Sequence, residues 1–115
     1  MKQIKFTTVL TPEDLLDVTL HIEKQELIKF ALNYRALIRG MWRVVYRVDN
    51  FHGFLHEQRF WRNPKPIRIE GKTSEDLDAV RKEYVTQIFE NYKRYRQYFE
   101  EMIDNNEKAN FKNGT

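Results

Sequence analysis

Between Leu16 and Phe60, apolar side chains fall on even-numbered positions in one run after another. Successive side chains of a β-strand point to opposite faces, so this period of two is typical of strands that lay one face on a core. The pattern predicts that this part of the chain folds into a sheet whose even-numbered residues are buried. The set consists of Leu16, Val18, Leu20 and Ile22, then Ile28, Phe30, Leu32, Tyr34 and Ala36, then Trp42, Val44, Tyr46 and Val48, and finally Phe54 and Phe60.

One of these segments also allows another interpretation. Residues 25–38 contain Glu-Leu-Ile-Lys and Ala-Leu-Asn, which favour a helix locally, and Gly40 could end that helix. The strand is favoured here because it keeps the buried face continuous with the segments on both sides.

The sequence predicts how two of the strands pair. A three-residue loop at 38–40, with its glycine in a left-handed bulge, would set Tyr34 opposite Val44. The same register sets Arg35 opposite Arg43 on the odd-numbered face. Like charges placed opposite each other cost stability, and an anionic partner is one reason to tolerate that cost.

A second loop, at 49–53, would set Tyr46 opposite His56 in the next hairpin. An antiparallel meander results. The segments Ile4–Val9 and Ile67–Ile69 could extend it at the edges.

A helical pattern follows the predicted strands. It runs from Thr73 to about Asp104, and its apolar stripe at helical spacing consists of Leu77, Val80, Tyr84, Ile88, Tyr92, Tyr95, Phe99 and Met102. At 1.5 Å per residue such a helix spans roughly 45 Å, which exceeds the ~30 Å of a small domain. Its last turns therefore either project or are covered by a partner.

We therefore expect a single α+β domain at residues 1–104, in which an antiparallel β-meander of about four to five strands packs against one long C-terminal helix. Residues 105–115 are polar and predict a disordered tail. The chain has no Cys, which excludes a disulfide scaffold, a thiolate nucleophile and a Cys-based zinc site. No apolar run reaches the roughly 18 residues of a membrane span, so we expect a soluble, cytoplasmic protein with no membrane partner.

The densest group of reactive side chains lies between Arg47 and Arg59. Its histidines can carry a proton near neutral pH, and a carboxylate can orient them. We take His52 as the candidate proton carrier, Asp49 as its orienter and His56 as a third candidate catalytic residue. Structural roles are the alternative, because Asp favours turns and an even-numbered His56 would face the core.

The same side chains raise the question of a metal. Asp49, His52, His56 and Glu57 are all acceptable ligands. A spacing of four residues brings two histidines together on one side of a helix. His52 and His56 do not lie on a predicted helix, so we expect no metal site and no cofactor.

Positive charge is concentrated in the middle of the chain. Residues 41–72 carry seven basic and three acidic side chains, whereas residues 73–115 carry seven and nine. A basic sheet face could follow an RNA backbone, although an ordinary solvated face is the alternative explanation. The candidate nucleic-acid-binding residues on this face are Arg35, Arg43, Arg47 and Arg59.

The segment from Tyr34 to His56 resembles a prokaryotic family of small domains of unknown function marked by the pattern R-x-D, two residues, H-G, two residues, H. The residues that match are Arg47, Asp49, His52, Gly53 and His56. More distantly, the chain is similar to the TumE-type toxins of toxin–antitoxin pairs, which share a strand with Asp followed closely by His and then a terminal helix. The resemblance covers roughly the central third of the chain plus the helix, and it implies an RNA-directed or partner-bound role.

Two functions from different classes follow. The first is a toxin–antitoxin-like protein that binds or cleaves RNA through the hairpin at 47–59. The second is a non-enzymatic interaction module that forms a homodimer or binds a partner protein through the helix around Tyr95, Phe99 and Ile103.

Overall fold

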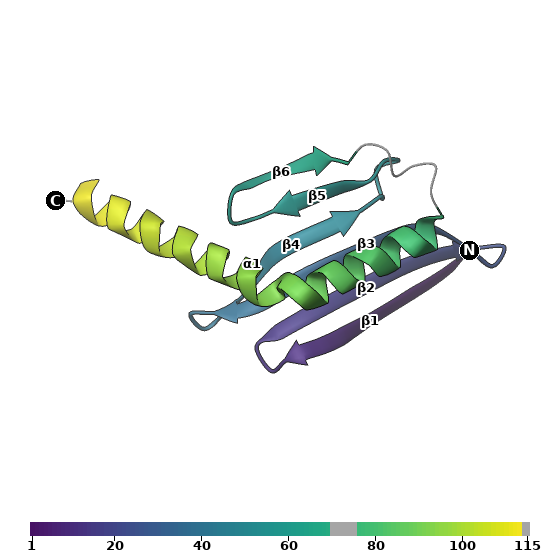
Figure 1. The fold of residues 1–115 in the computed structure, drawn as a ribbon, viewed down its shortest axis with the longest axis horizontal. Coiled ribbons are helices and arrows are strands. Elements are labelled where there is room, and N and C mark those ends of the chain that lie inside the picture. The colour runs from purple at the N-terminus through teal and green to yellow at the C-terminus, as the bar shows by residue number, and fades with distance from the viewer. Residues whose placement is uncertain (70–75, 114–115) are drawn as a thin grey trace.

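Six antiparallel strands followed by one helix make up this computed structural model, which describes residues 1–69 and 76–113. The strands pair in chain order, from β1 at one edge to β6 at the other (Figure 1). The predicted α+β meander is confirmed, with six strands rather than four to five, because both edge segments form full strands. The elements are β1 (Lys2–Thr11), β2 (Asp14–Glu23), β3 (Glu26–Ile38), β4 (Met41–Asp49), β5 (His56–Arg59), β6 (Asn63–Arg68) and α1 (Leu77–Asn113).

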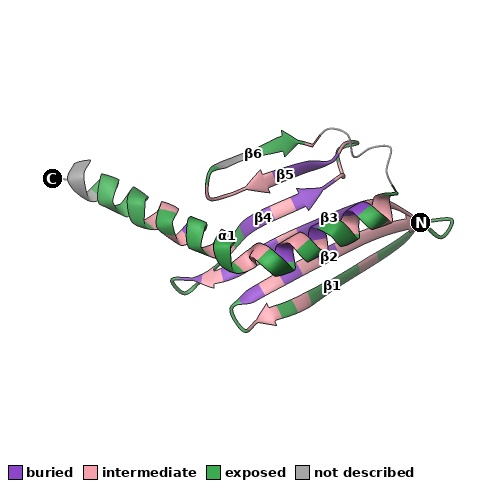
Figure 2. Ribbon diagram, viewed as in Figure 1, coloured by how far each residue is buried: buried purple, intermediate pink, exposed green. Residues whose placement is uncertain are grey.

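One face of the sheet lies under α1, which contacts β3 and β4. We call this the helix face and the opposite side the outer face. The predicted parity holds over residues 16–20 of β2 and 30–38 of β3, and the segment at 25–38 is a strand rather than a helix. At the other end of this strand pair a bulge sets Ile22 opposite Leu27, so Leu27 packs against the core and the prediction for Ile28 was wrong. Burial is concentrated on these central strands and on the adjoining side of α1 (Figure 2). The core includes Leu16, Val18, Phe30, Leu32, Tyr34, Ala36 and Ile38 from the strands and Val80, Tyr84, Ile88 and Phe99 from α1.

The β3–β4 hairpin differs from its predicted register. Arg39 and Gly40 both have positive φ, of 55° and 75°, and form a two-residue turn instead of the three-residue loop. This turn sets Arg35 opposite Val44, and the register shifts only beyond that pair, at a bulge after which Tyr34 lies opposite Tyr46. The prediction that Arg35 faces Arg43 was therefore wrong.

The two-residue turn reverses the faces of the first half of β4, and the bulge ends this reversal. Trp42 pairs with Leu37 and lies on the outer face with Val44, where they are 42% and 37% exposed. Beyond the bulge, Tyr46 returns to the helix face and is fully buried.

The β4–β5 hairpin differs as well. Its loop covers residues 50–55 and not 49–53, which pairs Asp49 with His56 and Val48 with Glu57. An odd-numbered residue thus faces an even-numbered one, so His56 moves to the outer face. The prediction that His56 lies opposite Tyr46 on the core face was wrong.

The helix α1 continues to Asn113 instead of ending near Asp104, and it runs on through the stretch in which we expected a frayed tail. The predicted first residues, 73–75, lie outside the described residues. The C-terminal turns extend past the sheet (Figure 1), where Arg39 of the β3–β4 turn donates hydrogen bonds to Asp104 and Glu107. Within the described part of the chain, α1 lacks the apolar character needed to cross a membrane.

Candidate functional site

A buried carboxylate and imidazole form a pair at the open end of β4. The Nε2 atom of His56 lies 3.3 Å from Oδ2 of Asp49, and the two side chains are only 4% and 3% exposed. The same oxygen accepts a hydrogen bond of 2.8 Å from Nε of Arg47, while Oδ1 accepts one of 2.9 Å from the backbone N–H of Phe51. Asp49 is therefore fixed by three donors.

His52 lies on the solvent side of this pair. It is exposed, and its ring stacks on that of His56 with 5.4 Å between the centroids. The nitrogen and oxygen atoms that Asp49, His52 and His56 offer as ligands lie within 4.8 Å of one another. The three predicted catalytic residues thus come together, but Asp49 contacts His56 and not His52.

The loop at 50–55 folds over the outer face and builds this cluster. Asn50 holds its start by accepting a hydrogen bond from the Phe30 N–H (2.8 Å) and donating one to the Ile28 carbonyl (3.2 Å). The ring of Phe51 then packs edge-on against His21, 4.8 Å away. The buried position of Asp49 and His56 follows from this cover.

One polar atom of the cluster has no partner. Nε2 of His56 faces the Asp49 carboxylate, whose oxygens accept hydrogen bonds. Nδ1 of the same ring is buried, and no hydrogen-bond partner for it exists among the described residues. An unpartnered nitrogen of a buried imidazole is a common feature of proton-transfer and metal sites.

The cluster offers three ligands to a cation, although we expected no metal here. The Arg47 guanidinium competes for the same oxygen of Asp49. A fixed positive charge at that oxygen opposes a bound cation and favours an anion. The donor set therefore fits a phosphate-directed acid–base site better than a metal site.

The four predicted nucleic-acid-binding arginines do not share one face. Arg35 and Arg47 lie on the outer face, because their partners Val44 and Asn33 do. Arg43 and Arg59 lie on the helix face, opposite Ala36 and Tyr46. The two-residue turn before β4 moves Arg43 to the helix face, and the longer loop before β5 does the same for Arg59.

Arg35 and Arg59 are ion-paired. Arg35 binds Asp17, with 2.8 Å between Nε and Oδ2. Burial raises the pKa of Asp17, but the hydrogen bonds from Arg35 and Thr7 outweigh it and leave the pKa below its ordinary value of 3.8. Arg59 binds Glu57, with 2.7 Å between nitrogen and oxygen.

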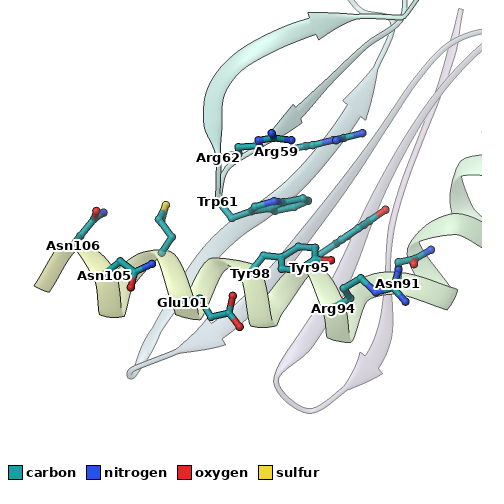
Figure 3. Close-up of a pocket in the computed structure, with 11 residues that line it drawn as sticks. Arg59, Trp61, Arg62, Asn91, Arg94, Tyr95, Tyr98, Glu101, Asn105 and Asn106 are labelled. Atoms are coloured by element: carbon teal, nitrogen blue, oxygen red, sulfur yellow. The ribbon is translucent and has the colours of Figure 1, made fainter. Parts of the chain in front are cut away.

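A groove on the helix face was not predicted. It has a volume of about 740 Å³ and lies between the β5–β6 turn and α1 (Figure 3). Aromatic rings form its floor, and its walls carry arginines, amides and one carboxylate, that of Glu101. Its lining consists of Arg59, Trp61, Arg62, Asn91, Arg94, Tyr95, Tyr98, Glu101, Met102, Asn105 and Asn106.

The helical part of this groove left a signal in the sequence. Asn91, Arg94, Tyr98 and Asn105 recur at the spacing of one helix face, next to the apolar stripe. The contribution of Trp61 left no such signal, because it depends on how the β5–β6 turn folds back toward α1.

Under the groove lies a buried polar contact. The Tyr46 hydroxyl donates a 2.7 Å hydrogen bond to Glu57, which is 7% exposed. Burial and this bond raise the pKa of Tyr46 well above its usual range, so the phenol stays protonated. Tyr46 also supports Tyr95, whose ring centroid is 5.0 Å away.

The chain belongs to a family of domains of unknown function, DUF7718, which matches residues 1–105. The match includes the whole sheet, both sites described above and most of α1. Neither a curated protein nor a solved structure matches the chain.

Proposed function

We propose that this domain binds RNA and cleaves its phosphodiester backbone at the cluster of Arg47, Asp49, His52 and His56. The observation that carries the proposal is the convergence of two imidazoles, a carboxylate and a guanidinium at one hairpin, with ligand atoms of Asp49, His52 and His56 within 4.8 Å of one another. The more distant of the two resemblances, to TumE-type toxins, supports RNA as the substrate.

His52 carries the proton in this proposal, because it is the exposed member of the cluster. It removes the proton of a ribose 2′-hydroxyl, and the freed oxygen attacks the adjacent phosphorus. The bond from phosphorus to the 5′-oxygen breaks, and that oxygen takes a proton from water. The products are a 2′,3′-cyclic phosphate and a 5′-hydroxyl.

The other members hold the phosphate and position His52. The side chain of Arg47 is 34% exposed, and its guanidinium can neutralise charge on the phosphate. Asp49 fixes Arg47 and His56, and the His56 ring supports that of His52. Arg35, farther along the outer face, contributes to RNA binding but not to the bond-breaking step.

An RNA cleavage assay tests this proposal. We expect His52→Ala to reduce kcat by about 100-fold or more, which is typical for removal of a general base. Arg47→Ala lowers kcat, whereas Arg35→Ala raises KM alone. Lys93→Ala, at an exposed position of α1, is the matched surface control. Equal cleavage by wild type and His52→Ala would exclude this site.

Partner binding through α1 is the second candidate function. The last turns of the helix project beyond the sheet (Figure 1), and residues 104–110 are exposed. Of the three apolar residues that we assigned to a partner, Phe99 is only 7% exposed and Tyr95 and Ile103 pack against the core. Sedimentation velocity at high concentration tests this candidate, and a monomer at every concentration would count against a homodimer.

A further inference from the structure

We propose that the groove between the β5–β6 turn and α1 binds unpaired nucleotides of a single RNA strand. This site lies on the helix face and therefore differs from the histidine cluster on the outer face. The choice of RNA as the strand rests on the proposed function, whereas the fit to a base with its phosphate rests on the groove itself.

The floor of the groove is a stack of aromatic rings. Trp61 and Tyr95 lie nearly parallel, with 4.9 Å between their centroids, and Tyr98 follows at 5.7 Å from Trp61. The ring of Tyr98 is tilted by 44° against that of Trp61 and is 39% exposed, so it is open to a further planar group. An unpaired base suits such a platform, because every base can stack on an aromatic ring.

The walls supply positive charge where the phosphates of that base would lie. In Figure 3, Arg59 and Arg62 flank Trp61 from the β5–β6 side, and Arg94 extends from α1. Glu57 forms an ion pair with Arg59. Within residues 1–69 and 76–113, neither Arg62 nor Arg94 lies within salt-bridge distance of a carboxylate. Two guanidiniums are therefore available to an anionic ligand.

The length of the groove fits a short piece of a single strand. Its helix side extends from Asn91 to Asn106, which corresponds to about 22 Å along the helix axis. A stacked strand advances about 3.4 Å per nucleotide, so the groove holds only a few nucleotides. A volume of about 740 Å³ agrees with that size.

Tryptophan fluorescence measures this binding directly. The chain has two tryptophans, Trp42 and Trp61, so Trp42→Phe leaves Trp61 of the groove as the sole reporter. We expect a ten-nucleotide oligouridylate to quench this protein at low salt. Tyr98→Ala should weaken binding about tenfold, and Phe89→Ala, which removes another exposed aromatic ring of α1, should leave it unchanged.

A second pair of variants separates the groove from general charge. Arg94→Ala should weaken binding severalfold and reduce the salt dependence by about one phosphate contact, whereas Lys93→Ala should change binding less than twofold. Both substitutions remove one positive charge from α1. Equal effects of the two would overturn the proposal, because binding would then follow net charge and not the groove.

Binding is measured in His52→Ala as well, so that failure of cleavage and failure of binding are distinguished. Quenching that persists in His52→Ala supports the groove as an independent site. No quenching at low salt, or equal losses in Tyr98→Ala and Phe89→Ala, would overturn it. Binding of a ten-nucleotide oligothymidylate without binding of oligouridylate would overturn the choice of RNA.

Discussion

Asp49 shows how one side chain can organise a site. Its carboxylate accepts hydrogen bonds from Arg47 and from the Phe51 N–H and contacts His56, so a strand residue, a loop and the next strand meet at one group. The sequence pattern from Arg47 to His56 was sufficient to select these residues as candidates. It did not show that Asp49 pairs with His56, because that contact depends on the length of the loop between them.

The ion pair of Asp17 with Arg35 makes the stability of the fold depend on pH. The folded pKa of Asp17 lies below its ordinary 3.8, so the unfolded chain binds a proton more readily than the folded chain does. The stabilisation is therefore complete above pH 3.8 and is lost as the pH falls through the lower folded pKa. Asp17→Asn should lower the Tm at neutral pH.

Thermal melts of wild type and Asp17→Asn between pH 7 and about pH 2 test the sign of this effect. The difference in Tm should stay constant down to about pH 5 and then shrink. A difference that widens in acid would contradict the assignment.

Among the strands, the sequence predicted which segments form the sheet better than it predicted how these segments pair. Alternation identified β2 and β3 and most of their buried residues, and the two edge segments became β1 and β6. It failed in the first half of β4, where the two-residue turn places Trp42 and Val44 on the outer face. One residue fewer in a turn, or one more in a strand, exchanges the two faces, and alternation does not mark where either occurs.

The β3–β4 turn depends on glycine. Gly40 has a φ of +75°, and a Cβ added there would meet no atom within 4 Å. Gly40→Ala should therefore destabilise the fold by about 1 kcal/mol through backbone strain alone. Gly40→Asn should cost less, because Asn tolerates this conformation. Urea denaturation compares the two, and a larger loss for Asn would contradict this explanation.

Arg96 joins α1 to the ends of two hairpins. It donates hydrogen bonds to the Leu37 carbonyl (2.8 Å) and to Asp14 (3.2 Å), and Asp14 is 5% exposed. Arg96→Met would leave the Asp14 carboxylate buried without its cation. We expect a loss of about 3 kcal/mol in the free energy of unfolding.

A double-mutant cycle checks the cause of that loss. In Asp14→Asn the buried group is neutral, so adding Arg96→Met should cost clearly less than it does in the wild type. Additive losses in urea denaturation would show that Arg96 acts through its other contacts, those with Glu13, Leu37 and Glu100.

At the scale of the whole molecule, the sheet separates two sites. The histidine cluster lies on the outer face under the loop at 50–55, and the groove with Trp61 and Tyr98 lies on the helix face. The sequence placed the arginines on one continuous face, and the structure divides them between both. The basic side chains of the middle third therefore lie on two surfaces of the sheet. The family match at residues 1–105 includes nearly all of the residues that form these surfaces.

Whether the cluster around His52 cleaves RNA is decided by single-turnover cleavage of a labelled RNA. The rate is compared for wild type, His52→Ala and Asp49→Asn, with Lys93→Ala as control and with folding of each variant confirmed by circular dichroism. We expect a 2′,3′-cyclic phosphate product and a rate that falls by about 100-fold in His52→Ala, while Lys93→Ala keeps the wild-type rate. Unchanged cleavage by a folded His52→Ala, or no cleavage by the wild type, would contradict this expectation.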